Sequence, residues 1–266
     1  MDVTSVWIAM SLSLTVLKAT DAFLPHLEIE KRLFQFGKTA SSSTLHSSLH
    51  VPKSRFLHFY VFASVLDSYG LLVSETLVVR IANGVHLIHV SRRVYECFFV
   101  HRFGKDAKIH TLHYLLGLTF YPLCFLSLNQ SVDLKLESLL DVFWLAVGLF
   151  LVGIGSIHQH RAFLILRDSR SCAGGYGVPM GDWFAFSSCP HYLSEILIYL
   201  GFCFLTLWKS PAVQQACLFV LINQGIAAQM SHAWYRVTFK AYPTERSALF
   251  SLSTFLRWFT ATWQAC

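Results

Sequence analysis

Seven stretches of this sequence are apolar enough, and at about 20 residues long enough, to cross a lipid bilayer as α-helices. They lie near residues 3–24, 56–79, 81–100, 111–129, 139–157, 191–208 and 212–230. Only 14% of the residues are charged, whereas a soluble domain carries about 25%, so the chain lacks the polar surface to cover a globule in water. The sequence therefore predicts an all-α integral membrane bundle of seven helices, with residues 1–266 forming one membrane domain.

The basic residues predict how this bundle is oriented, because cytoplasmic loops of membrane proteins carry an excess of Lys and Arg. One set of alternate connections carries Lys31, Arg32, Lys38, Lys53, Arg55, Arg102, Lys105, Lys108, Arg161, Arg167, Arg170, Arg236, Lys240, Arg246 and Arg257. The other set carries only Arg80, Lys135 and Lys209. This bias predicts a lumenal N-terminus and a cytosolic C-terminus.

The first apolar run resembles a signal peptide in length, but Lys18 and Asp21 replace the small residues of a cleavage site. The Ser- and His-rich stretch after it, "GKTASSSTLHSSLHVPKSR", predicts a loop. The seven Cys show no CxxC or other metal-ligand spacing, and their odd number argues against a framework of disulfides alone. We interpret them as small apolar residues.

Charged residues at bilayer depth are costly and are therefore candidates for a functional site. In the third run, "HLIHVSRRVYECFFV" places a polar group inside an apolar span: His86, His89, Arg92, Arg93, Tyr95 and Glu96. One interpretation is an arginine fork that faces the bundle interior and suits phosphate or carboxylate. The other is that the span ends near residue 91 and the arginines extend to the membrane interface. The residues alone leave both open.

A second polar cluster precedes the sixth run, in "GDWFAFSSCPHYLSEILIYLG", which holds Asp182, His191, Tyr192 and Glu195. Glu195 lies four residues after His191 and therefore on the same helical face. A buried carboxylate needs hydrogen-bond donors, which a ligand amide or hydroxyl would supply. The alternative is an acid in the first turn of the helix, favoured by the helix dipole.

Residues 158–190 are predicted to form the longest late cytosolic connection. Its "HQHR" motif puts His158 and His160 on different helical faces, so we interpret them as loop residues or cofactor contacts and predict no metal site. The glycines of "CAGGYGVP" allow close backbone approach. The sequence has no GxGxxG after a strand and no Walker motif, so neither common nucleotide-binding fold is indicated.

The stretch "SHAWYRVTFKAYPTER", residues 231–246, follows the last apolar run. His232, Tyr235 and Arg236 fall on adjacent faces of a helix that continues from the membrane, and Pro243 predicts where that helix breaks. Aromatic and basic residues at this depth also form membrane-interface belts, so the stretch is either such a belt or part of a site.

These blocks together resemble the steroid 5α-reductase family. The resemblance is carried by "GDWFAFSSCPHYLSEILIY", "SHAWYRVTFKAYPTERSALF" and "HVSRRVYECFFV", and it covers residues 55–250. The variants "SRRVYEC" and "GDWF…SSCPHYLSE" are closest to the polyprenol (polyprenal) reductase branch. The resemblance implies NADPH as cofactor and saturation of the α-isoprene double bond of polyprenal or polyprenol. It also implies a place on the route to dolichol for protein N-glycosylation, in the endoplasmic reticulum membrane.

The resemblance further implies a cofactor-binding part at about residues 158–246. The implied cofactor contacts are Arg93, Gln159, Arg167, Arg170, Tyr176, His191, Glu195, His232 and Tyr235. Glu195 is expected to hold the nicotinamide carboxamide, and the arginines the phosphates. The steroid branch has a catalytic tyrosine directly after the histidine of the third span, whereas here Val90 follows His89. We therefore expect Tyr95, His89 or water to supply the proton.

Three further departures from the family pattern bear on function, and three alternative functions remain open. Gly177 replaces a basic residue of the steroid branch, His191 replaces an asparagine, and the tail "SLSTFLRWFTATWQAC", residues 251–266, is unlike the expected short apolar ending.

The alternatives are a steroid 3-oxo-5α-reductase, an isoprenylcysteine-type membrane methyltransferase that binds S-adenosylmethionine, and a non-catalytic membrane protein. The predicted partners are a long-chain polyprenal or polyprenol and membrane lipid, with no nucleic acid.

Overall fold

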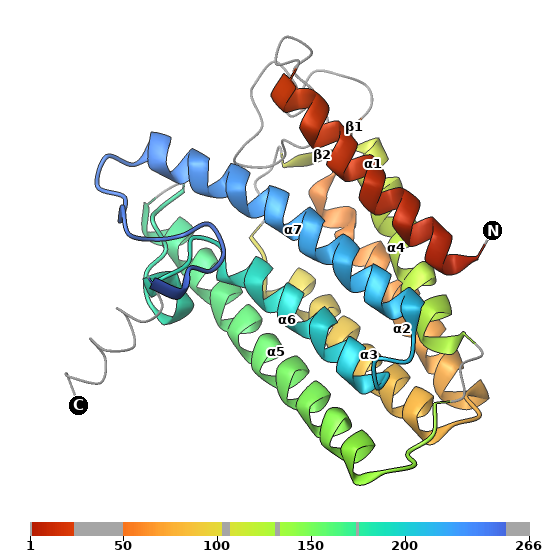
Figure 1. Ribbon diagram of the computed structural model, residues 1–266. Helices are drawn as coiled ribbons and strands as arrows, with labels where there is room; N and C mark the ends of the chain where they lie inside the picture. Colours follow the sequence, from red (N-terminus) through yellow and green to blue (C-terminus); the bar gives the residue numbers. More distant parts are fainter. Residues whose placement is uncertain (1, 24–49, 103–106, 131–133, 174–175, 254–266) are drawn as a thin grey trace, which may run out of the picture.

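The computed structural model describes residues 2–23, 50–102, 107–130, 134–173 and 176–253, and within them the protein is a bundle of seven α-helices (Figure 1). The helices are α1 (Val3–Phe23), α2 (Phe56–Val73), α3 (Leu77–Tyr95), α4 (Thr111–Asn129), α5 (Leu139–Ala173), α6 (Pro190–Leu205) and α7 (Pro211–Thr238). Each coincides with one predicted apolar run, which confirms the all-α membrane bundle.

Short elements connect the helices. Strand β1 (His50–Pro52) pairs antiparallel with β2 (Lys108–His110), and the 3-10 helix η4 (Lys53–Arg55) leads into α2. The π-helical segment η5 (Glu96–Val100) continues α3, and the 3-10 helix η6 (Asp182–Ala185) precedes α6. Residues 50–55 were expected to be loop, and that prediction is wrong because β2 supplies a partner strand distant in sequence. Residues 37–49 of the same expected loop and 254–266 of the tail lie outside the described residues.

Two helices run further than hydropathy predicted. α5 continues to Ala173, so the prediction of a connection that begins at residue 158 is wrong, and His158 and His160 lie on a helix. α7 continues to Thr238, with Phe239 as its C-cap, so the helix ends before Pro243 and the proline does not end it. Both extensions are polar, and hydropathy therefore assigned them to loops.

Among the described residues, four helical segments are long and apolar enough to cross a membrane: Val3–Phe23, Lys53–Val73, Thr111–Asn129 and Leu139–Arg170. α6 is apolar but has 16 residues, and polar residues interrupt α3 and α7. Large apolar side chains such as Leu72 and Leu139 are 83% and 90% exposed, as a surface in contact with lipid requires.

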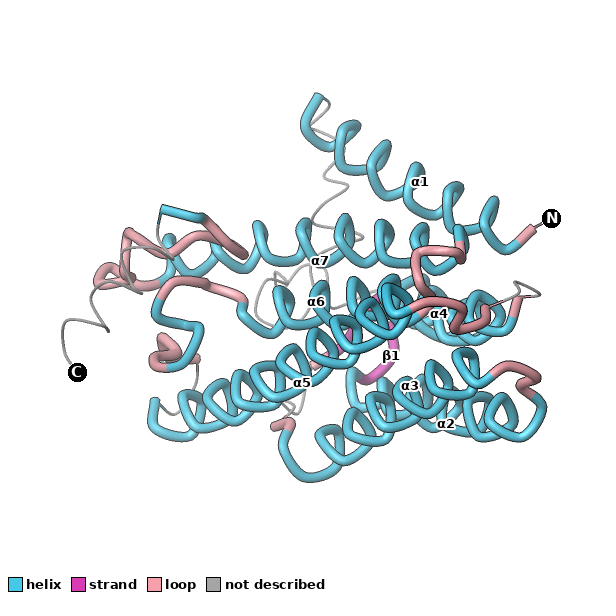
Figure 2. The backbone as a smooth tube through the Cα atoms, turned by 60° about the horizontal axis from the view of Figure 1, so that its bottom comes forward, coloured by secondary structure: helices cyan, strands magenta, loops and turns pink. Residues whose placement is uncertain are grey.

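Helix α1 lies along the outer side of α7, and α7 lies beside α6, which packs along α5 (Figures 1 and 2). α2 pairs with α3 and also contacts α4. Trp7 of α1 is fully buried; its Nε1–H donates to Ser127 Oγ of α4 at 2.8 Å, and its ring packs against Phe120 and Phe219. Helix α1 therefore covers the seam between α4 and α7.

α5 and α6 approach each other closely because glycine faces the partner helix. A Cβ added at Gly155 would lie 2.8 Å from Ile198 Cγ1 and 2.9 Å from the carbonyl oxygen of Ser194. Membrane helices use small residues in this way to bring their backbones together. The contact positions the site, because Gln159 follows Gly155 by one turn and Glu195 follows Ser194.

We expect Gly155→Val to push α5 and α6 apart and to lower thermal stability, since overpacking of a close contact costs about 1–3 kcal/mol. Gly153→Val is the matched control, because a Cβ at Gly153 meets no atom within 4 Å. The melting temperatures of both variants, purified in detergent, make the comparison. Equal melting temperatures would show that the α5–α6 contact tolerates a side chain.

Candidate active site

A cavity of about 380 Å³ lies between α2, α4, α5, α6 and α7, within the size range of small-molecule sites. The wall that α5 and α6 form is polar and includes Gln159, Arg167, Arg170, His191 and Glu195. The wall that α2, α4 and α7 form is mainly apolar and includes Phe59, Leu116, Phe120, Phe219, Val220 and Met230. The structure thus brings a polar and an apolar surface to one cavity.

Glu96 is fully buried and lies at the centre of an ion-pair cluster beside this cavity. It accepts hydrogen bonds from Arg92 Nη1 at 2.5 Å and from Arg93 Nη1, and His160 Nδ1 lies 2.9 Å from its Oε1. Both guanidinium groups face the bundle interior, as one interpretation of the sequence proposed. The carboxylate that they bind is the neighbouring Glu96 of their own chain, and α3 does not end near residue 91.

Gln159 connects the arginine cluster to the cavity. Its Oε1 accepts a hydrogen bond from Arg92 Nη2 at 2.5 Å, and its Nε2 donates to Glu195 Oε2 and to the His191 carbonyl oxygen, the latter at 3.2 Å. These three bonds fix which end of the amide faces Glu195. Gln159 therefore holds the Glu195 carboxylate through Oε2, and Oε1 of Glu195 is directed away from Gln159.

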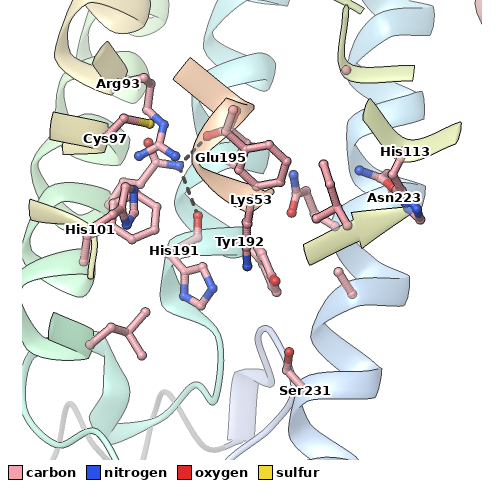
Figure 3. Close-up of a pocket in the computed structure, with 18 of the residues that line it drawn as sticks. Lys53, Arg93, Cys97, His101, His113, His191, Tyr192, Glu195, Asn223 and Ser231 are labelled. Atoms are coloured by element: carbon pink, nitrogen blue, oxygen red, sulfur yellow. Dashed lines mark hydrogen bonds between the residues drawn. The ribbon is translucent and has the colours of Figure 1, made fainter. Parts of the chain in front are cut away.

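Glu195 and His191 share one face of α6 and point into the cavity (Figure 3). Glu195 stands in the second turn of α6, so the alternative of an acid in the first turn is wrong. Its Oε1 lies 3.9 Å from His89 Nε2, beyond hydrogen-bond reach, and its side chain is 14% exposed. One oxygen of a positioned carboxylate thus remains accessible from the cavity, as a ligand N–H would require.

Three arginines approach the cavity from α3 and α5. Arg93 is placed over the Phe163 ring at 4.4 Å, and its Nη2 donates to Tyr60 Oη at 3.0 Å. Arg170 lies over the Tyr176 ring at 4.7 Å and donates to the Arg102 carbonyl oxygen. Arg167 pairs with the adjacent Asp168. Aromatic rings hold two of these cations in fixed orientations.

His101 follows η5 and also lines the cavity. Burial and then the nearby Arg93 guanidinium lower the pKa of His101 to about 3, so its imidazole is neutral at physiological pH. Its ring packs edge-on against Phe163, with the ring centroids 4.6 Å apart. The positive charge at this end of the cavity therefore comes from arginine and lysine.

Tyr235 lines the cavity, whereas His232, one turn earlier on α7, is absent from the lining that the described residues form. His232 Nδ1 lies 2.6 Å from Ser188 Oγ, which also accepts a hydrogen bond from Tyr242 Oη at 2.6 Å. The Tyr242 ring stacks on Tyr235 with an interplanar angle of 5°. His232 thus helps to hold the segment after α7 against the loop before α6, and this contact supports Tyr235 from behind.

The two expected proton donors lie apart. Tyr95 is 51% exposed, next to Phe99 and His160, and does not belong to the cavity lining among the described residues. His89 is 1% exposed and its Nε2 lies 3.9 Å from Glu195 Oε1, so it lies just behind the cavity wall. The structure therefore brings His89, but not Tyr95, close to the other expected site residues.

His158 and His160 point in different directions, as their spacing predicted. His158 Nδ1 lies 2.9 Å from Asp182 Oδ2, and its ring stacks on Trp183 at 3.9 Å, whereas His160 pairs with Glu96. Both are on α5, so their interpretation as loop residues is wrong. In the part of the chain that the structure describes, no three His, Cys, Asp or Glu side chains group in a way that could hold a metal ion.

Sequence reasoning missed several residues of the cavity wall: Lys53, Tyr60, Tyr121, Asn223 and Gln224. The amides of Asn223 and Gln224 lie inside the predicted apolar run 212–230 and could have indicated the site, because polar residues at bilayer depth mark functional sites. The tyrosines gave no signal, since a tyrosine in a membrane helix is common at interfaces. Lys53 belonged to the expected loop and was counted only for orientation.

Comparisons with known proteins identify relatives of this chain. The family model described as 3-oxo-5-alpha-steroid 4-dehydrogenase matches residues 122–252. A polyprenal reductase of Danio rerio is 30% identical over 80% of this chain and 84% of its own length. One of Caenorhabditis elegans is 32% identical over 77% of this chain and 71% of its own length. Polyprenal reductase 1 of Arabidopsis thaliana is 28% identical over 94% of this chain and 99% of its own length.

The chain belongs to the steroid 5α-reductase family, whose members are membrane oxidoreductases that act on carbon–carbon double bonds. Several of the relatives that it matches over most of its length are polyprenal reductases. The oxidoreductase family membership sets aside the methyltransferase alternative.

Proposed function

We propose that this protein uses NADPH to reduce the α-isoprene double bond of polyprenal, on the route to dolichol for protein N-glycosylation. The observation that carries the proposal is the cavity itself, which joins a cationic wall containing one positioned carboxylate to an apolar, aromatic wall. The first wall suits a charged dinucleotide, and the second suits an isoprenoid. The polyprenal reductases among the relatives support the choice of substrate.

The charges around the cavity fit NADPH. The described lining residues include five basic side chains and one acidic side chain: Lys53, Arg93, Arg102, Arg167, Arg170 and Glu195. Guanidinium groups bind phosphates through paired N–H donors. We assign the phosphates to Arg167 and Arg170, because Glu96 and Tyr60 hold Arg93 in buried contacts, whereas the Asp168 side chain that pairs with Arg167 is 61% exposed and such surface pairs are weak. Tyr176, Tyr235 and His191 complete this wall.

Glu195 orients the nicotinamide end in this proposal. Gln159 holds Oε2, so Oε1 accepts the carboxamide N–H, and the ring face is fixed toward the apolar wall. Bound NADPH supplies a hydride, which needs an electrophilic β-carbon. The aldehyde suits this chemistry better than the alcohol, because its carbonyl stabilises the charge that develops on the substrate.

Tyr60 is placed to polarise the substrate carbonyl. Its oxygen accepts a hydrogen bond from Arg93, and its own O–H remains available on the cavity side. A preorganised donor at a developing oxyanion is worth a few kcal/mol. His89 remains our proposed proton donor, because its Nε2 lies 3.9 Å from Glu195 Oε1, whereas Tyr95 is directed away from the cavity.

The setting follows from the sequence. We propose one membrane domain in the endoplasmic reticulum, with a lumenal N-terminus and a cytosolic C-terminus, so that the cationic wall near the N-terminus of α6 is open to cytosolic NADPH. The isoprenoid tail extends past the apolar wall into lipid. The steroid reductase alternative is disfavoured because Val90 stands where that branch has its catalytic tyrosine.

A substrate panel tests the proposal. Purified protein in detergent receives NADPH with polyprenal, polyprenol or testosterone, and NADPH loss and lipid product are followed. We expect oxidation with polyprenal. Turnover of testosterone instead would assign the protein to the steroid branch, and turnover of polyprenol alone would make the alcohol the substrate. Failure to bind NADPH would favour the non-catalytic alternative.

A further inference from the structure

The part of the cavity wall that α7 contributes has two amide side chains at its middle. Asn223 and Gln224 both line the cavity and are half-buried, and the lining residues on either side of them, Val220 and Ala227, are apolar. Polar side chains inside membrane helices are costly and mark functional sites by default. A hydrocarbon chain that lies against this wall would not by itself require them.

Neither amide has a hydrogen-bond partner among the residues that the structure describes. Other amides within the bundle are satisfied by protein groups. Asn83 of α3 donates to Ser74 Oγ at 2.9 Å and exchanges two hydrogen bonds with Asn129 of α4. Buried polar groups normally find such partners. Asn223 and Gln224 line the cavity, so the cavity is where a ligand group would satisfy them.

Asn223 lies on the side of α7 that faces α4. It follows Phe219 by four residues and therefore shares its helical face. The Phe219 ring packs against that of Phe120 on α4, with the ring centroids 5.9 Å apart. The two helices are antiparallel, since Ser210 at the N-cap of α7 donates to the Ser127 carbonyl oxygen near the end of α4. Asn223 thus stands one turn from the aromatic side chains of the apolar wall.

Asn223 is also level with Tyr60 along the bundle. Four residues beyond the aromatic contact, the antiparallel helices bring Asn223 level with residues 116 and 117 of α4. Gly117 packs so closely on α2 that a Cβ there would lie 2.5 Å from Phe59 Cε2. Tyr60 follows Phe59 and lines the cavity. Asn223 of α7 and Tyr60 of α2 therefore bound the cavity at the same level.

Glu195 of α6 lies at this level too. Thiol–carbonyl contacts near both ends show that α6 and α7 are antiparallel, and one of them joins Cys189 Sγ to the Ala228 oxygen at 3.9 Å. Six residues further along α6, Glu195 is level with Asn223 and Gln224 to within a turn. Gln224 precedes Ala228 by four residues and so lies toward α6. Gln224 is thus on the side of the carboxylate assigned to the cofactor, and Asn223 is on the side of the apolar rings.

The ligand group that fits Asn223 is a carbonyl oxygen at the end of an apolar chain. An amide NH₂ group donates hydrogen bonds, and a carbonyl oxygen accepts two. The rings of Phe120 and Phe219 offer a surface for the chain. Tyr60, whose Oη accepts a hydrogen bond from Arg93, supplies a second donor. Figure 3 shows Asn223 on the opposite side of the cavity from Arg93, so the two donors approach a carbonyl from different helices.

We propose that Asn223 donates a hydrogen bond to the aldehyde oxygen of polyprenal and forms, with Tyr60, the oxyanion site of the reaction; the proposal rests on the reductase activity proposed above. As a hydride bonds to C3, the C2=C3 π pair forms the C1–C2 double bond and the carbonyl π pair passes to oxygen. Asn223 stabilises that charge and keeps its proton. When C2 is protonated, the carbonyl re-forms. Asn223 is therefore a catalytic residue.

Asn223→Leu is the main variant, because leucine nearly matches the shape of asparagine and has no donor. We expect kcat/KM for polyprenal to fall about 100-fold, as loss of one donor at a developing oxyanion does, with the Kd for NADPH unchanged. Gln229→Leu is the matched control, since it replaces an amide by leucine on α7 at an exposed position outside the described cavity lining. It should keep wild-type turnover.

The carbonyl stretch of bound polyprenal reports the hydrogen bond directly. Polyprenal labelled with ¹³C at C1 is bound to each protein together with NADP⁺, which has no hydride to transfer, and isotope-edited infrared spectra are recorded. A hydrogen bond lowers the carbonyl frequency. We expect wild type and Gln229→Leu to share a low frequency and Asn223→Leu to show a higher one. A purely structural role of Asn223 would change the melting temperature and leave this frequency unchanged.

Equal carbonyl frequencies in wild type and Asn223→Leu would overturn the assignment, and so would an Asn223→Leu enzyme with the kcat/KM of wild type. Asn223→Ala removes the same donor without adding bulk and decides the question if the leucine variant is unstable. If wild type does not oxidise NADPH with polyprenal, the proposed function fails, and the infrared comparison alone decides whether Asn223 donates to the aldehyde.

Discussion

Glu195→Gln is expected to lower kcat/KM for polyprenal-dependent NADPH oxidation by about 100-fold, equivalent to about 3 kcal/mol for a lost hydrogen bond to a charged group. Gln159 Nε2 donates to one oxygen of residue 195, so the amide oxygen of the variant would face Gln159. Its NH₂ group would then point into the cavity, where the carboxamide N–H of the cofactor needs an acceptor. Two donors would meet, and the cofactor would lose its orientation.

Glu75→Gln is the matched control, because it makes the same chemical change at an exposed position between α2 and α3. We expect it to leave NADPH binding and turnover at the wild-type level. Binding is measured by NADPH fluorescence in detergent, and turnover by NADPH loss with polyprenal. A Glu195→Gln enzyme with normal Kd and kcat would remove Glu195 from the cofactor site.

The fold was largely predictable because the length of an apolar run is a physical requirement of the bilayer. Hydropathy failed where a helix leaves the apolar layer, since residues 158–173 of α5 and 231–238 of α7 are polar but remain helical. These extensions matter, because they carry Gln159, Arg170 and Tyr235. Hydropathy therefore located the bundle but missed the polar extensions of α5 and α7 beside the cavity.

Site residues were predictable where a helical face determines their direction. Glu195 and His191, four residues apart, share the cavity face of α6 as expected. For His232 and Tyr95 the helical face was not enough to predict the contacts. His232 contacts Ser188 of the loop before α6. Tyr95 lies two residues after Arg93 and therefore faces the outer side of α3. Spacing along one helix could not reveal which neighbour each side chain meets.

Glu96→Gln is expected to destabilise the protein more than any other single change discussed above. Glu96 is fully buried and neutralises Arg92 and Arg93, and the variant would leave both guanidinium groups without their carboxylate. Removal of one partner from a buried ion pair costs about 3–5 kcal/mol. The melting temperature in detergent should fall clearly, whereas Glu137→Gln, at an exposed position, should leave it unchanged.

The double variant Arg92→Gln/Glu96→Gln separates charge balance from site geometry. Removing Arg92 as well restores the net charge of the cluster, so part of the lost stability should return if uncompensated charge is the cause. Activity should not return with it, because Arg92 also donates to Gln159 Oε1 and so orients the amide that holds Glu195. A double variant no more stable than Glu96→Gln would show that the carboxylate acts through shape and hydrogen bonds rather than charge. Recovery of activity together with stability would show that Gln159 keeps its orientation without Arg92.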